Sequence, residues 1–313
     1  MRISLIAVPY DLGRADVGSG RGPGAYLKAG AAEALRARGH DVEVVTVQRE
    51  APFSDELQAV LAVDDAVAAA VEAALRRDAF PLVVAGNCNA ALGVRAGLQR
   101  GDAAEAALVW LDAHGDFNTP ATTETGYLDG MPLAMLCGRA YHEQASGVLG
   151  MTAVDEAAVL HAGGRELDRE EAASLAASAV RVVEGRELRG RGPAEVLAPV
   201  LDALAAERAA GIDAASDGPP PAHLHVDLDV LDPAAAPGVT FPSPRGLTAG
   251  QLLESIDLVR ERFVLAAVTV ASFTPARDDD AGTTLAAGLA ILQRVTTELA
   301  GGPEGPRACP AAG

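Results

Sequence analysis

Short apolar runs alternate along the chain with longer segments in which apolar and charged residues recur at helical spacing. Eight aliphatic or β-branched runs predict strands, at 3–9, 42–47, 81–86, 107–112, 157–163, 180–184, 222–230 and 264–272. Amphipathic segments between them predict helices, at 25–39, 55–77, 90–100, 193–211 and 248–263. This order predicts a mostly parallel sheet with helices on both faces. Because such sheets bind ligands at the carboxyl ends of their strands, functional residues should directly follow strands.

Composition and length suit one folded α/β domain. Apolar residues make up 49% of the 313-residue chain and charged residues 22%, as in globular proteins. We expect residues 1–302 to form a single domain, and the Gly/Pro/Ala-rich residues 303–313 to be a disordered tail. The formal net charge of −18 argues against nucleic acid and anionic membranes as partners, since both need a basic surface. The charge does not by itself identify a partner, and we expect a small-molecule substrate.

The location of the protein is predicted to be cytoplasmic. The first apolar run is short and ends at a proline, so it indicates a strand and not a signal peptide. No apolar stretch reaches the ~18 residues of a membrane span. The three cysteines, Cys88, Cys137 and Cys309, are too few for a disulfide framework and suit a reducing compartment.

Acidic side chains and a histidine follow two of the predicted strands. Asp112, His114 and Asp116 come after one run, and Asp227 and Asp229 end another. In extended chain alternate residues share a face, so each set should project together. Five such groups at strand ends would repel each other without a cation. Carboxylate oxygen with imidazole nitrogen suits Mn²⁺, and less commonly Zn²⁺, although one Asp-x-His-x-Asp alone can be structural.

Five segments resemble the ureohydrolase superfamily of arginases, agmatinases and formiminoglutamases. The two main ones are WLDAHGDFNTP and HLHVDLDVLDP; the others are GRGPGAYLKAG, AGGRELD and PGVTFPSPRGLTAGQLLE. The resemblance covers nearly the whole chain. It implies a three-layer α/β/α fold around an eight-stranded parallel sheet, and assembly into homo-oligomers.

The resemblance also implies a metal site. In the family six ligands hold two Mn²⁺ ions, whose chemistry is to activate water against a guanidinium or amidine carbon. Asp112, His114, Asp116, Asp227 and Asp229 match five of the six. Cys88 stands where the family has the sixth, a histidine. It is either a ligand, which would favour Zn²⁺, a packed side chain, or a nucleophile. The resemblance thus implies one or two divalent ions per chain.

Other positions depart from the family pattern or keep it. Asp129 replaces a histidine that helps in proton transfer, and Ser272 replaces the glutamate that grips the guanidinium. His225 stands where arginases commonly carry serine, and is either a core histidine or a catalytic or metal partner. Asn118 and Thr125 resemble arginase residues that bind the amino-acid end of the substrate.

Three functions remain open. The first is a metal-dependent hydrolase of linear C–N bonds, acting on a guanidine or amidine that is neutral or differently substituted. The substitutions at Asp129 and Ser272 argue against ordinary arginase or agmatinase activity. The second is a catalytically inactive member that binds metal or ligand, or regulates a partner. The third is a hydrolase with a single metal ion.

Overall fold

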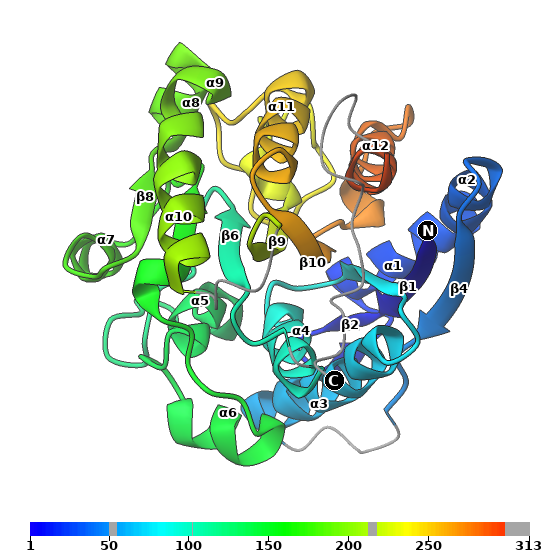
Figure 1. The fold of residues 1–313 in the computed structure, drawn as a ribbon, viewed down its shortest axis with the longest axis horizontal. Coiled ribbons are helices and arrows are strands. Elements are labelled where there is room, and N and C mark those ends of the chain that lie inside the picture. The colour runs from blue at the N-terminus through cyan, green and yellow to red at the C-terminus, as the bar shows by residue number, and fades with distance from the viewer. Residues whose placement is uncertain (50–54, 102, 212–217, 298–313) are drawn as a thin grey trace.

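Eight parallel strands form the central sheet of the protein (Figure 1). The computed structural model describes residues 1–49, 55–101, 103–211 and 218–297, so the predicted tail at 303–313 lies outside the described residues. The strand order is β4-β1-β5-β10-β9-β6-β7-β8. The strands are β1 Arg2–Val8, β4 Asp41–Thr46, β5 Phe80–Ala85, β6 Ala107–Leu111, β7 Val159–Ala162, β8 Arg181–Val183, β9 Pro221–Asp227 and β10 Val264–Ala271. Each lies within or beside a predicted run, so all eight predictions are confirmed.

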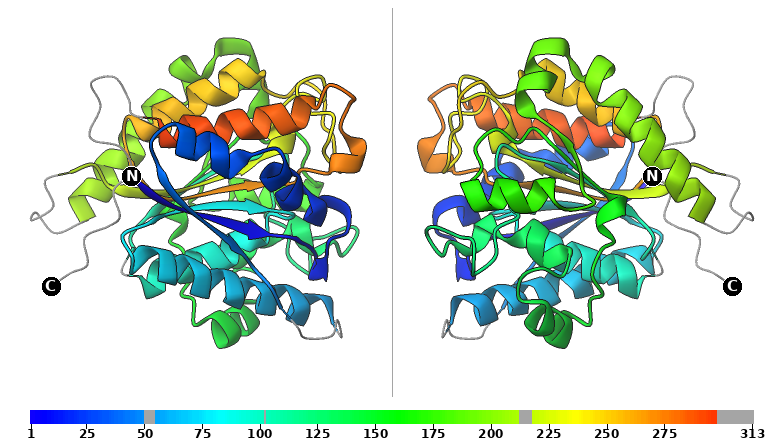
Figure 2. Two further views of the ribbon diagram at one scale, coloured as in Figure 1. Left: turned by 90° about the vertical axis from the view of Figure 1, so that its right-hand side faces the viewer. Right: turned by 90° about the vertical axis from the view of Figure 1, so that its left-hand side faces the viewer.

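Helices cover both faces of the sheet, which confirms the three-layer α/β/α fold (Figure 2). On one face lie α1 Gly22–Lys28, α2 Ala31–Ala37, α8 Gly185–Arg191, α9 Pro193–Val196, α10 Ala198–Gly211, α11 Ala249–Arg260 and α12 Thr283–Thr296. On the other lie α3 Glu56–Leu75, α4 Ala90–Arg100, α5 Pro132–Leu136 and α6 His142–Leu149. The short α7 Arg169–Ala176 flanks the β8 edge. In the described residues, no helix is long and apolar enough to cross a membrane.

The buried sheet explains why its strands read as continuous apolar runs. In β1, Ile3 and Leu5 pack in the core under α1 and α2, while Ile6 and Val8 pack in the core above α3. Alternate residues therefore enter different cores, and each must be apolar. The sheet therefore buries apolar side chains, and removes their surface from water, on both of its faces.

Two predicted helices are each divided into two. The segment 25–39 forms α1 and α2, because Gly30 takes a φ of 81°, a left-handed conformation that glycine adopts easily. The segment 193–211 forms α9 and α10, which meet at Leu197. Neither break alters the sheet.

The four central strands, β5, β10, β9 and β6, bring separate parts of the chain together. Cys88 follows β5, Ser272 follows β10, Asp227 ends β9, and Asp112 follows β6. Because the strands are parallel, these four positions lie together at the carboxyl end of the sheet. These four candidate residues therefore lie where ligands bind in sheets of this kind.

Candidate active site

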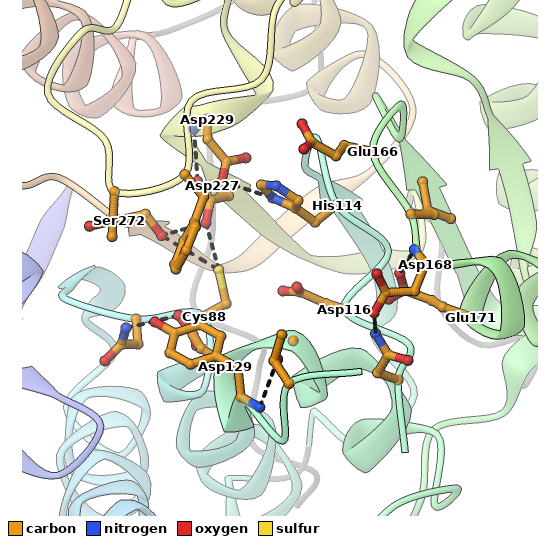
Figure 3. A pocket seen from close by; sticks show the side chains of 18 of the residues that line it. Cys88, His114, Asp116, Asp129, Glu166, Asp168, Glu171, Asp227, Asp229 and Ser272 are labelled. Carbon is orange, nitrogen blue, oxygen red and sulfur yellow. Dashed lines mark hydrogen bonds and ion pairs between the residues drawn. The ribbon is translucent and has the colours of Figure 1, made fainter. Parts of the chain in front are cut away.

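A cavity of about 360 Å³ opens at the carboxyl edge of the central strands (Figure 3). Nine of the residues predicted from the sequence line it: Cys88, His114, Asp116, Asn118, Thr125, Asp129, Asp227, Asp229 and Ser272. Two others, Asp112 and His225, lie beneath its floor and are 1% and 0% exposed. His225 therefore does not line the cavity.

His114 lies between two carboxylates at the cavity floor. Its Nδ1 is 3.1 Å from Oδ2 of Asp229 and 3.6 Å from Oδ1 of Asp112. Burial alone would lower the pKa of His114, but these carboxylates raise it to about 12. Ligand atoms of the three residues lie within 4.8 Å of one another. This group therefore requires positive charge at its centre, from a proton or a metal ion.

Short turns orient these side chains. The strands that were predicted to orient them end earlier in the chain. Asp227 caps the one-turn 3₁₀ helix Leu228–Val230, and its Oδ1 accepts a hydrogen bond from the Asp229 N–H at 2.7 Å. Asp112 accepts from the His114 N–H at 2.8 Å, just past the end of β6. Asp116 lies in a left-handed conformation with a φ of 50°. The strand predicted through Asp229 ends at Asp227, so that bound is wrong, and the extended chain on which the projection of Asp116 depended does not persist beyond Leu111.

Cys88 occupies the loop between β5 and α4 and contacts the end of β9. Its thiol donates to Oδ2 of Asp227 at 2.8 Å, and the hydroxyl of Ser272 donates to the same oxygen. Burial and the nearby carboxylates, Asp227 first, raise the pKa of the Cys88 thiol well above its usual value. A neutral thiol among carboxylates is a poor nucleophile, so this environment disfavours the nucleophilic alternative.

A second group of possible metal-ligand atoms is more deeply buried than the group around His114. Cys88, Asp112 and His225 each offer an atom within 4.8 Å of the others. The imidazole of His225 stacks on Trp110, and neither ring nitrogen has a hydrogen-bond partner. Burial lowers the pKa of His225 to about 3, so its ring is neutral. Oδ2 of Asp116, which lines the cavity, also has no partner. These unpaired buried atoms, with carboxylate and imidazole donors nearby, fit divalent-metal binding.

Asp129 lies on the wall of the cavity. The side-chain amides of Asn87 and Asn89 donate to its oxygens at 2.8 and 2.5 Å. Burial raises the pKa of Asp129 to about 7, against the effect of these hydrogen bonds. A carboxyl group with such a pKa can exchange a proton near neutrality.

Three further carboxylates, which we did not predict, line the opposite side of the cavity: Glu166, Asp168 and Glu171. Asp168 accepts a hydrogen bond from the Asn118 side chain at 2.9 Å, and Glu171 accepts from the Phe117 N–H. Glu166 and Asp168 belong to the AGGRELD segment, which was the available signal. With seven carboxylates and no lysine or arginine among its lining residues, the cavity favours cations.

Aromatic and hydroxyl groups complete the wall. Phe241 and Tyr127 meet edge to face with ring centroids 5.2 Å apart, and Phe241 is 49% exposed. Thr125 accepts a hydrogen bond from the Tyr127 N–H at 3.2 Å, so it shapes the loop that carries this ring. The wall thus combines an apolar surface with the acidic floor.

A family model, sequence relatives and solved structures all relate this chain to the same family. The sequence model of the arginase family matches residues 1–297. The arginase of Bacillus subtilis (strain 168) is 31% identical, over 88% of this chain and 91% of its own length, and that of Bacillus caldovelox is 30% identical, over 88% and 92%. A crystal structure of arginase from Bacillus subtilis covers 96% of this chain and 100% of its own, with a TM-score of 0.80 and 30% identity. The chain belongs to the arginase family.

Proposed function

We propose that the protein is a divalent-metal-dependent hydrolase of linear C–N bonds, acting on a guanidine- or amidine-type substrate other than arginine or agmatine. The family relationship supports hydrolysis of this bond class. The names of the relatives favour ordinary arginase activity, whereas the environment of Ser272 favours a different substrate. We also propose a single-domain, homo-oligomeric, cytoplasmic protein.

The observation that carries the proposal is the group formed by Asp112, His114 and Asp229 at the floor of an acidic cavity. Two carboxylates and an imidazole are a suitable donor set for Mn²⁺, Zn²⁺ or a similar ion. A bound divalent ion supplies Lewis acidity and lowers the pKa of water. Asp116 and Asp227 lie on the same cavity wall and offer further carboxylate oxygens.

The residues of the chain then bind and orient the substrate around this centre. Glu166 and Asp168 are placed to hold a cationic group at the far side of the cavity, and Asn118 keeps Asp168 in position. Asp129 accepts or returns a proton, since its pKa of about 7 lies near the working pH. Phe241 and Tyr127 shield the cavity entrance from water on one side.

The environment of Ser272 supports a substrate other than a cationic guanidinium group. A serine hydroxyl provides no negative charge, and here it donates to Asp227. A guanidinium group placed beside Ser272 would find no carboxylate at that position itself, and Oδ2 of the neighbouring Asp227 already accepts from Cys88 and Ser272. A neutral or N-substituted group has less need of that carboxylate.

A second function is favoured by one specific contact. Oδ2 of Asp227 accepts hydrogen bonds from both Cys88 and Ser272, so protein donors already occupy a candidate ligand oxygen. A catalytically inactive protein that binds one ion or a cationic ligand would keep this arrangement. Metal content alone does not separate the two functions, but turnover does.

The deciding experiment is a hydrolysis screen of the full-length protein with guanidines, amidines and amides. Each assay is supplied with Mn²⁺, Zn²⁺, Fe²⁺, Co²⁺ or Ni²⁺, and includes arginine and agmatine for comparison. We expect turnover of a non-arginine substrate, and its loss in His114→Ala. No turnover of any substrate with any ion would exclude the hydrolase and support the inactive binding protein. Arginine as the best substrate would refute the substrate assignment alone.

A further inference from the structure

His225 differs from the other two fully buried histidines of the described chain. His161 and His223 each form one hydrogen bond through Nε2, to the His114 carbonyl and the Thr269 hydroxyl. His225 forms none through either nitrogen, although it is 0% exposed. Because an unpaired buried polar group is costly, a partner bound to the ring nitrogens of His225 would explain this arrangement.

The surroundings of His225 identify the kind of partner. The Cys88 sulfur and an Asp112 oxygen lie within 4.8 Å of its available nitrogen and of each other. All three side chains are at least 98% buried, and Cys88 alone reaches the cavity. A thiol, a carboxylate and a neutral imidazole converging on one point are ligands for a metal ion.

We propose that Cys88, Asp112 and His225 form a distinct ion site, selective for Zn²⁺ over Mn²⁺, beside the oxygen-rich site of Asp112, His114 and Asp229. The inference rests on the proposed metal-dependent function and specifies the ions. Thiolate and imidazole ligands favour Zn²⁺, whereas Mn²⁺ prefers carboxylate and water oxygens. Asp112 belongs to both groups and thus joins the two sites.

The site needs no large rearrangement to accept an ion. Trp110 supports it from one side, since it stacks on His225 and its Nε1–H donates to Asp112 at 3.0 Å. Cys88 would bind an ion as its thiolate and would release the thiol proton to water in the cavity that it lines. Cys88, the one of the three that lines the cavity, would hold the ion on the side that a small ligand in the cavity can reach.

Two features of the composition make a direct test available. Trp110 is the single tryptophan of the chain and contacts both Asp112 and His225, so its fluorescence reports on the region that the two sites share. Replacing Cys137 and Cys309 with serine leaves Cys88 as the single cysteine. In that background, Co²⁺ bound to Cys88 gives a thiolate-to-cobalt charge-transfer band, and its proximity quenches Trp110.

The experiment compares this single-cysteine protein with Cys88→Ser and His225→Asn derivatives. Each is stripped with chelator and dialysed against Zn²⁺ with excess Mn²⁺, and bound metals are measured by mass spectrometry. We expect about one Zn²⁺ per chain, the cobalt band and Trp110 quenching in the parent. Each derivative should lose Zn²⁺ affinity by more than the roughly 10- to 100-fold typical of changes around a ligand, and should retain Mn²⁺.

The possible failures have different meanings. A parent protein without the cobalt band, or derivatives with unchanged Zn²⁺ content, would overturn the zinc site while Mn²⁺ binding leaves the proposed function standing. Absence of any bound metal would overturn both. Circular dichroism checks folding; if His225→Asn does not fold, Cys88→Ser and the cobalt spectrum of the parent still decide the question.

Discussion

The imidazole ring of His225 lies against the indole ring of Trp110, with centroids 3.7 Å apart and an interplanar angle of 15°. The two are register partners on the neighbouring strands β9 and β6. The same indole donates a hydrogen bond to Asp112. One side chain therefore orients two candidate metal ligands that lie far apart in the sequence.

Replacing Trp110 with phenylalanine separates these two effects. Phenylalanine keeps an aromatic surface for His225 but cannot donate to Asp112. We expect Trp110→Phe to fold and to bind metal roughly 10-fold more weakly, measured by calorimetric titration of the stripped protein. Phe80→Leu, a buried aromatic substitution at the opposite end of the sheet, should lower stability and leave metal affinity unchanged. Equal affinities in Trp110→Phe and wild type would show that the indole only fills space.

The pKa of Asp129 predicts the pH dependence of turnover. Burial raises it to about 7, so the ionised fraction of this carboxyl group grows as pH rises through that value. If Asp129 accepts a proton, kcat should fall as pH decreases below about 7. Asp129→Asn should remove this limb of the pH profile and lower kcat by about 10²- to 10⁴-fold.

The control for Asp129 lies across the cavity. Asp168→Asn removes a carboxylate that lines the same cavity, so it should raise KM and leave the acid limb in place. A flat wild-type profile between pH 6 and 8, or the same limb in Asp129→Asn, would assign proton transfer to another group.

Substitutions of Ser272 test whether the lack of a carboxylate at this position sets the preference between cationic and neutral substrates. Ser272→Glu places a negative charge on the cavity wall next to Asp227. A charge-assisted hydrogen bond contributes about 1.5–3 kcal/mol, so kcat/KM for cationic guanidines relative to neutral substrates should rise about 10- to 100-fold. Ser272→Gln has the same size without the charge and should not change this ratio. A matching change in both variants would attribute the effect to shape.

The sheet was predictable because its strands are buried on both faces. The strands β5 Phe80–Ala85 and β6 Ala107–Leu111 are apolar at every position, and this pattern does not depend on distant contacts. Helix ends were less predictable. Gly30 interrupts a segment of uniform helical composition, and only its left-handed φ shows that the axis turns there.

Site residues were predictable where a polar side chain stands at or directly after the end of a strand. Asp112 and Asp227 met that condition. Glu171 did not, because a glutamate three residues into a helix reads as part of a capping box, which it also forms with Asp168. The unpaired state of His225 was hidden as well, since it depends on cross-strand register and on a cysteine 137 residues earlier in the chain.

The close contact between α3 and α4 sets the position of the Cys88 loop, and Gly93 makes that contact possible. A Cβ at Gly93 would lie 2.4 Å from the Asp64 carbonyl oxygen and 2.7 Å from Cβ of Val67, both on α3. We expect Gly93→Ala to lower the free energy of unfolding by about 1–3 kcal/mol in urea denaturation, because α4 must move away. Gly147, on α6, has no atom within 4 Å of such a Cβ, so Gly147→Ala should raise stability by about 0.5–1 kcal/mol. Since α4 begins two residues after Cys88, Gly93→Ala should also weaken metal binding, and unchanged stability with unchanged affinity would refute this coupling.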